Sequence, residues 1–206
     1  MFALVESGTI TQFPKGNKGI TLGDNQYPKS IYTLWTEAER NAIGIYTVII
    51  DNTNFKDQTF YINTDQTYTF DSDADSVTAA YGTATAKAIA DVNAVDEDGE
   101  ALLDSDGNQV VNYGLKTNYK NQFNTQAAGL LLPTDWYVVK ATEVSDYSVP
   151  SAITTYRAAV RTKVNAMETA IDGCANVAAL ITLLTYVKQE DDTITRPLGE
   201  FPDEVI

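Results

Sequence analysis

Hydrophobic and polar positions alternate in the first part of the chain, which is the pattern of half-buried β-strands. Alternating apolar residues flank the Ser7-Gly8 dipeptide. A two-residue turn in that setting predicts a hairpin over residues 1–13. The alternation returns between residues 58 and 92, at Phe60, Ile62, Tyr68, Phe70, Val77, Ala79 and Tyr81. We therefore predict that the N-terminal part is rich in β-structure.

A short helix interrupts these strands. Thr36 and Glu39 have the spacing of a capping box, in which each side chain bonds the backbone amide of the other residue. Gly44 supplies a left-handed end to this helix, and the β-branched and aromatic residues 45–50 predict a strand. The glycine-rich segment 14–30 is expected to form an irregular, exposed loop.

Helical spacing begins at Leu115 and continues to residue 132, where Pro133 is expected to end the helix. A second helix is predicted from Pro150 to Gly173. Asn176 caps a third helix, whose apolar face reaches residue 187, and the tight connection predicts that the second and third helices lie side by side. The stripe of the second helix is Ile153, Tyr156, Val160, Val164, Met167, Ile171 and Cys174.

These patterns predict an α+β fold with a β-rich part over residues 1–113 and a helical module over 114–190 that contains an antiparallel helix pair. The β-rich part divides into a module over 1–50 and a region over 51–113, which includes an exposed excursion with two Asp-Gly turns. The acidic tail over 191–206 is expected to lack regular structure.

Charge limits the choice of partners. The chain has 28 acidic and 14 basic residues, a formal net charge of -14, which repels phosphate backbones and anionic lipid surfaces. Nucleic acid and membrane are therefore not expected as partners. Neither a signal peptide nor a spanning helix is expected, and Cys174, the single cysteine, is predicted to be a buried small hydrophobe.

The candidate chemistry is sparse because the sequence contains no histidine. Ser-His-Asp and Cys-His catalysis and the commonest zinc ligand are thereby excluded. Acidic pairs occur in the turns at 71–75 and 96–106, without a surrounding apolar cleft, and the EF-hand registers through them fail. We therefore predict a non-enzymatic protein without cofactor or metal, with carboxylate catalysis and an irregular calcium site as weaker alternatives.

Two stretches resemble a known group of proteins. The run Leu132-Pro-Thr-Asp-Trp-Tyr-Val-Val-Lys-Ala-Thr-Glu143, followed by Thr155-Tyr-Arg-Ala-Ala-Val-Arg161, resembles the C-terminal module of phage tail and tail-fibre assembly proteins. The opening residues 1–14 resemble the β-module that begins many of them, ahead of a variable middle. The resemblance implies a protein that helps tail or fibre proteins fold and assemble, anchored by residues 1–50, and it implies no catalytic residues.

Four residues in this module are predicted to contact partners: Trp136, Tyr137, Arg157 and Arg161. The two rings follow a helix-breaking proline and are expected to wedge between the 115–132 and 150–173 helices. The arginines lie four positions apart on one helix face, where they either clamp a carboxylate, from Asp135 or from residue 143, or face a partner.

The predicted function is therefore that of a tail-associated structural or assembly protein. Its partners are expected to be tail, baseplate or tail-fibre proteins, or another copy of itself. It is expected in the host cytoplasm during assembly and in the virion tail, or as a transient chaperone absent from the mature particle. The alternative is a receptor- or glycan-binding module at a fibre tip, which uses the loops at 14–30 and 96–108.

Overall fold

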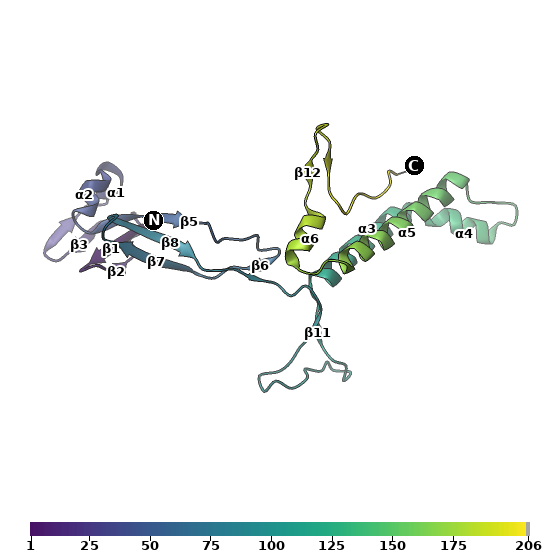
Figure 1. Ribbon diagram of the computed structural model, residues 1–206, viewed down its shortest axis with the longest axis horizontal. Helices are drawn as coiled ribbons and strands as arrows, with labels where there is room; N and C mark the ends of the chain where they lie inside the picture. Colours follow the sequence, from purple (N-terminus) through teal and green to yellow (C-terminus); the bar gives the residue numbers. More distant parts are fainter. Residues whose placement is uncertain (205–206) are drawn as a thin grey trace. The chain divides into compact units, whose positions relative to one another are not determined.

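The structure is a computed structural model that describes residues 1–204, and it has the predicted α+β fold. The chain forms two compact units, Met1–Thr85 and Ala86–Ile206. The first unit is built on β-strands and the second on helices (Figure 1).

The first unit contains a five-stranded sheet in the order β2-β1-β5-β8-β7. Neighbouring strands are antiparallel except β5 and β8, which are parallel. The two outer strands come together where the rings of Phe13 and Tyr68 lie 4.5 Å apart, so the sheet forms a nearly closed barrel. The strands are β1 (Phe2–Glu6), β2 (Thr9–Gln12), β5 (Ile45–Asp51), β7 (Gln66–Asp71) and β8 (Ser76–Tyr81). A shorter pair consists of β6 (Tyr61–Ile62) and β9 (Thr85–Ala86).

Strands β1 and β5 bury both of their faces. Successive residues of a strand point to opposite sides, so Ala3 and Leu4 belong to different apolar clusters, as do Tyr46 and Ile45. One cluster fills the barrel, and the other lies beneath α1 (Ile31–Leu34) and the neighbouring segments. The predicted 1–13 hairpin is confirmed, with Ser7 at a positive φ of 52° in its turn.

Two local predictions for residues 14–44 have different outcomes. The prediction of an irregular loop over 14–30 is wrong for residues 20–27, where β3 (Ile20–Leu22) and β4 (Asn25–Tyr27) form a hairpin that packs on the core, whereas residues 14–19 contain no helix or strand. The capping box is confirmed at the start of α2 (Glu37–Asn41): the Thr36 amide donates to Glu39 Oε2 at 2.8 Å, and the Glu39 amide donates to Thr36 Oγ1. The hydrogen bonds that the Glu39 carboxylate accepts from the Thr36 amide and the Thr36 hydroxyl lower the pKa of Glu39.

Gly44 lies at a point that only glycine fits without strain. Its φ is +80°, its carbonyl accepts from the Val5 amide at 2.8 Å, and a Cβ atom at this position would lie 2.6 Å from the Val5 carbonyl oxygen. The residue therefore joins the helical segment to the sheet through a close backbone approach.

Replacing Gly44 with alanine is expected to lower the free energy of unfolding of the first unit by about 2 kcal/mol, through left-handed strain and the collision with Val5. Gly8 is the matched control: its φ is +79° and open space surrounds the position of a Cβ atom, so Gly8→Ala is expected to cost only about 1 kcal/mol. Hydrogen exchange of the β5 amides measures both changes. Equal losses would contradict the role of the Val5 contact.

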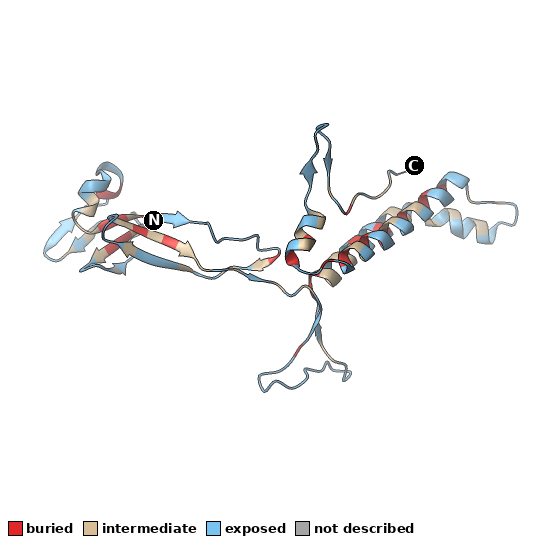
Figure 2. Cartoon of the chain, viewed as in Figure 1, coloured by how far each residue is buried: buried red, intermediate tan, exposed pale blue. Residues whose placement is uncertain are grey.

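The second unit is built on the antiparallel pair α3 (Leu115–Leu131) and α5 (Ser151–Asp172). Lys120 Nζ lies 2.9 Å from Asp172 Oδ1 near one end, and the Tyr156 hydroxyl donates to the Leu130 carbonyl at 3.4 Å near the other. The predicted apolar stripe of the second helix is buried along its whole length, and Figure 2 shows the buried residues between the two helices. Cys174 is buried as predicted, and burial raises the pKa of its thiol.

The prediction that the second and third helices lie side by side is wrong. α5 packs along α3, whereas the following helix α6 (Val177–Leu184) is short and makes only a brief contact with α5. Extended backbone begins at Thr185, since Thr185, Tyr186 and Val187 are residues that favour strands. The third helix therefore ends before residue 187 and does not lie side by side with the second.

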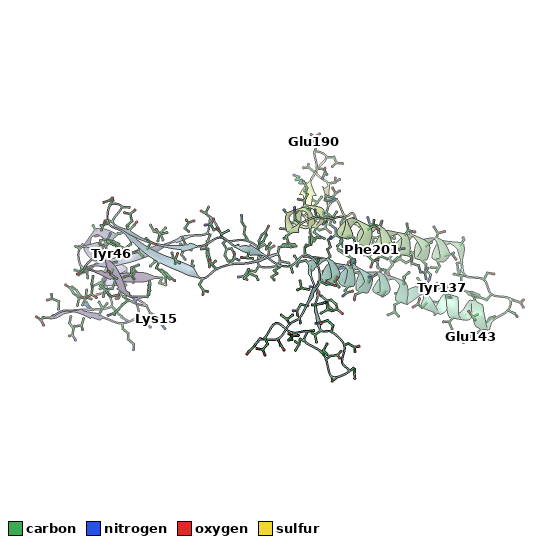
Figure 3. The ribbon with its side chains drawn as sticks, turned by 60° about the horizontal axis from the view of Figure 1, so that its bottom comes forward. Lys15, Tyr46, Tyr137, Glu143, Glu190 and Phe201 are labelled. Atoms are coloured by element: carbon green, nitrogen blue, oxygen red, sulfur yellow. The ribbon has the colours of Figure 1, made fainter. Side chains whose placement is uncertain are left out.

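Two segments outside the predicted helices and strands contain regular structure. A 3-10 turn (Leu132–Thr134) and α4 (Asp135–Glu143) continue the line of α3 (Figures 1 and 3). In the tail, β12 (Val187–Lys188) and β13 (Ile194–Thr195) form a hairpin, and Leu198 is buried. The expectation of no regular structure over 191–206 is therefore wrong at β13, whereas residues 196–204 contain no helix or strand. Residues 205–206 lie outside the described part.

The boundary between the units lies at 85/86, earlier than the composition change near residue 113. Residues 86–113 belong with the helices because they bond to the start of α3: the Gly114 amide donates to Asp91 Oδ1 at 2.8 Å, and the Leu115 amide to the Ala88 carbonyl at 3.0 Å. The predicted exposed excursion is confirmed between β10 (Val92–Asn93) and β11 (Val111–Asn112). Within residues 1–204, no helix has the length and apolar character needed to cross a bilayer.

Candidate partner-binding site at the tip of the helical unit

The four residues predicted to contact partners lie at one end of the helical unit, which we call the helical tip (residues 132–161). Trp136 and Tyr137 are in the first turn of α4, and Arg157 and Arg161 are in the first half of α5. Figure 3 labels Tyr137 and Glu143 on the α4 side of this tip. The structure thus brings together residues from two helices that are joined by a loop.

Arg157 holds the tip together. Its side chain is only 10% exposed, and Nη1 donates to Thr134 Oγ1 at 2.5 Å and to the Leu131 carbonyl at 3.1 Å, and it lies 2.7 Å from Asp135 Oδ1. Its positive charge lies at the C-terminal end of α3, where the helix dipole favours a cation. The internal ion pair is therefore confirmed, with Asp135 as the carboxylate.

Trp136 does not form the expected wedge. Its side chain is 51% exposed, because α4 continues the direction of α3 and carries residue 136 away from the interior of the helix pair. The Trp136 ring stacks on the partly buried Tyr137 ring, with centroids 3.9 Å apart. The Lys140 ammonium group lies 5.7 Å from the Trp136 ring and 4.3 Å from the Tyr147 ring, within the range of a cation–π interaction.

A small groove of about 280 Å³ opens beside Arg157, and we call it the tip groove. Val138 and Val149 give it apolar walls, and Thr154 and Arg161 complete it. Arg161 is exposed and forms no ion pair with any residue in the described range 1–204. This arrangement suits an apolar side chain that has a carboxylate next to it.

The C-terminal tail forms a second hollow, of about 450 Å³, against α5. Tyr156 and Ala159 lie on the helix side and Pro202 on the tail side. Burial raises the pKa of Tyr156, and the carboxylate of Glu204 adds to this effect. No sequence signal pointed to this hollow, because the tail showed no periodic pattern.

The aspartates considered as alternative catalytic or calcium sites accept hydrogen bonds from backbone amides. Asp96 Oδ1 accepts from the Glu100 amide at 3.0 Å, and Asp104 Oδ1 accepts from the Asn108 amide at 2.9 Å, a bond that lowers the Asp104 pKa. Each aspartate thus shapes one Asp-Gly turn. Among residues 1–204, no group of three or more histidine, cysteine or acidic residues is placed to hold a metal ion.

No protein-family model, curated protein or solved structure matches the chain. The resemblance to phage tail assembly proteins thus depends on the motif residues alone. Within that motif, Arg157 bonds to both Thr134 and Asp135, while Trp136, Val138 and Arg161 are exposed.

Proposed function

We propose that this chain is a non-enzymatic phage tail-associated structural or assembly protein that binds tail, baseplate or tail-fibre proteins through the tip groove. The proposal rests on one observation: within the segment that resembles phage tail assembly proteins, some residues bond internally and others stay accessible. Arg157 is occupied by internal bonds to Thr134 and Asp135, whereas Val138 and Arg161 remain accessible at the groove. A rigid turn thereby presents an apolar and cationic surface.

Charge favours a specific kind of partner segment. The formal net charge of -14 repels acidic surfaces in general, yet the tip gathers Lys140, Arg157 and Arg161 within a short stretch of structure. A segment with an apolar side chain next to a carboxylate places the first on Val138 and the second on Arg161. Electrostatic complementarity of this kind sets the orientation of binding as well as its rate.

The proposal is tested by measuring the affinity of the purified chain for the purified tail, baseplate and fibre proteins encoded by the same phage. A Val138→Asp/Arg161→Glu variant is expected to bind its partner at least tenfold more weakly, which corresponds to about 1.4 kcal/mol or more. Val187→Asp is the control, because Val187 is half exposed on the β12–β13 hairpin, outside the tip groove. An unchanged affinity of the tip variant would refute the site.

Mass spectrometry of purified particles separates the two forms of this function. A stoichiometric amount of the chain in mature particles identifies a structural component. Its absence from mature particles, together with binding to a partner before assembly, identifies a transient chaperone. Absence of binding to every tail, baseplate and fibre protein would contradict both.

A second candidate function is glycan or receptor binding, and one observation in the first unit favours it. A hollow of about 390 Å³ lies beside the 14–30 segment, and Lys15, Asn17, Lys18 and Tyr32 are among the residues that line it. Amino and amide groups next to an aromatic ring suit an acidic sugar. Glycan-array binding that is lost in a Lys15→Glu/Lys18→Glu variant would support this function.

A further inference from the structure

The excursion between β10 and β11 is ordered although it has hardly any apolar core. We call its residues 94–111 the knob, and Figure 1 shows them beyond the β11 label. Within the knob only Ala94 is buried, Gln109 and Val110 are half-buried, and every other residue is exposed. Burial of side chains therefore contributes little to its stability, and hydrogen bonds hold it in shape.

A repeat of eight residues builds the knob. Residues 94–101 and 102–109 share an aliphatic residue in second place, an aspartate in third place and Asp-Gly in fifth and sixth place. In each copy the third-place aspartate accepts hydrogen bonds from the amides two and four residues later, at 2.9–3.0 Å, and the glycine has a positive φ. The two copies therefore form equivalent turns, and Val110 begins a third, shorter copy.

The first residues of the three copies are joined in a ring of backbone hydrogen bonds. The Leu102 amide donates to the Ala94 carbonyl at 3.0 Å, and the Val110 amide donates to the Leu102 carbonyl at 2.8 Å. The Ala94 amide then donates to the Val110 carbonyl at 2.8 Å and closes the ring. In an ordinary antiparallel pair, two opposite residues exchange both bonds. Here three residues share them in a cycle, which gives the knob an approximate threefold arrangement.

The side chain of Gln109 bonds to all three carbonyls of this ring. Its Nε2 atom lies 2.8 Å from the Ala94 oxygen, 2.9 Å from the Val110 oxygen and 3.1 Å from the Leu102 oxygen. A side-chain amide has two N–H protons, so one proton is shared between two carbonyls. Each carbonyl thus accepts one bond from the ring and one from Gln109, which uses both of its lone pairs.

We propose that the Gln109 amide locks the knob, so that without this donor the ring opens and both Asp-Gly turns lose their fixed positions while the helices stay folded. A segment with few buried apolar contacts opens at a lower free energy than packed helices do. The bond between Asp91 and Gly114, which joins this region to the start of α3, lies outside the knob. The inference goes beyond the proposed function, because the tip groove contains no residue of the knob.

The first test is hydrogen exchange of the three ring amides in the full chain, followed by NMR. Gln109→Met keeps the length of the side chain and removes its donors, and Gln109→Glu keeps its shape but turns a carboxylate toward three carbonyls. Both variants are expected to speed exchange of the ring amides about tenfold or more, while the α5 amides exchange as in the wild type. If the Gln109→Met chain exchanges as slowly as the wild type, the side chain only fills space and the lock is refuted.

Ser105→Glu is the matched control for charge. Ser105 is exposed in the second turn, and its counterpart in the first turn is already a glutamate, Glu97. The substitution adds one negative charge to the knob, as Gln109→Glu does, but leaves the Gln109 amide in place. Exchange of the ring amides is expected to stay within about twofold of the wild type. Equal acceleration by Ser105→Glu and Gln109→Glu would show that repulsion between carboxylates opens the ring, and would contradict the lock.

A relocated glutamine tests the threefold arrangement itself. Ala101 ends the first copy as Gln109 ends the second, and its bridge to Val95 corresponds to the bridge between Gln109 and Leu103. A glutamine at position 101 is therefore expected to reach the same three carbonyls. Gln109→Ala alone is expected to open the ring, and the Ala101→Gln/Gln109→Ala chain is expected to recover slow exchange. Failure to recover overturns the threefold arrangement, and faster exchange that extends through α3 and α5 overturns the separate opening of the knob.

Discussion

Replacing Arg157 with methionine is expected to lower the free energy of unfolding of the helical unit by about 3 kcal/mol. The guanidinium group bonds Asp135, the hydroxyl of Thr134 and the last carbonyl of α3, so the substitution removes three charge-assisted bonds from a largely buried turn and leaves only the 2.7 Å bond from the Thr134 hydroxyl to that carbonyl. Thr134 is only 1% exposed and has no access to water in compensation. The Asp135 side chain is 51% exposed, which keeps the loss at the lower end of the range for a broken buried ion pair. Urea unfolding followed by the helical circular dichroism signal measures the loss.

Two further substitutions separate this role from a general effect of charge. Arg161→Met removes an exposed arginine of the same helix and is expected to change the stability by no more than about 0.5 kcal/mol. Arg157→Lys keeps the charge but loses the planar fork, and an intermediate loss of about 1–2 kcal/mol is expected. If Arg157→Met were as stable as Arg161→Met, the hydrogen-bonded turn would not be what holds the tip.

Predictions from sequence succeeded where the signal was local. The α5 stripe repeats over six turns between Pro150 and Gly173, and the structure places the helix at Ser151–Asp172. The capping box at Thr36 needs only a hydroxyl and a carboxylate three residues apart, and both of its bonds are present. In such segments a single periodicity or spacing determines the local structure, and distant contacts do not change it.

The α4 helix was not predicted because the local sequence does not favour a helix there. Pro133 predicts the end of a helix, yet a proline is also tolerated in the first turn of one, and here it lies in the 3-10 turn that leads into α4. Residues 136–139 are aromatic or β-branched, with modest helix propensity. Tertiary bonds from Arg157 to Asp135 and Thr134, which no sequence window contains, outweigh these preferences.

The candidate site was predicted in part. Trp136, Tyr137, Arg157 and Arg161 were named from the sequence, and they do lie in one region of the structure. The tip groove was not foreseen, because its apolar wall combines Val138 with Val149 from the loop that joins the helices. Such a wall depends on how the loop returns the chain, which the composition of either segment does not reveal.

Replacing Leu198 with alanine is expected to lower the stability of the helical unit by about 3 kcal/mol, through lost burial and the cavity that remains. Leu198 is 4% exposed, its amide donates to the Leu183 carbonyl at 3.1 Å, and its carbonyl accepts from Lys163 Nζ at 2.8 Å. Next to it, the Arg196 guanidinium lies 5.3 Å from the Phe123 ring and pairs with a carboxylate of the tail. Urea unfolding followed by circular dichroism measures the change.

The matched control for this substitution is Leu103→Ala, on the exposed excursion. Leu103 is 54% exposed, and its truncation is expected to change the stability by no more than about 0.5 kcal/mol. If the two alanine variants unfold at the same urea concentration, the tail does not dock on the helices in solution. If only Leu198→Ala is destabilised, one buried leucine and its backbone bonds order the tail despite the flanking Pro197 and Gly199, whose presence favoured an irregular segment.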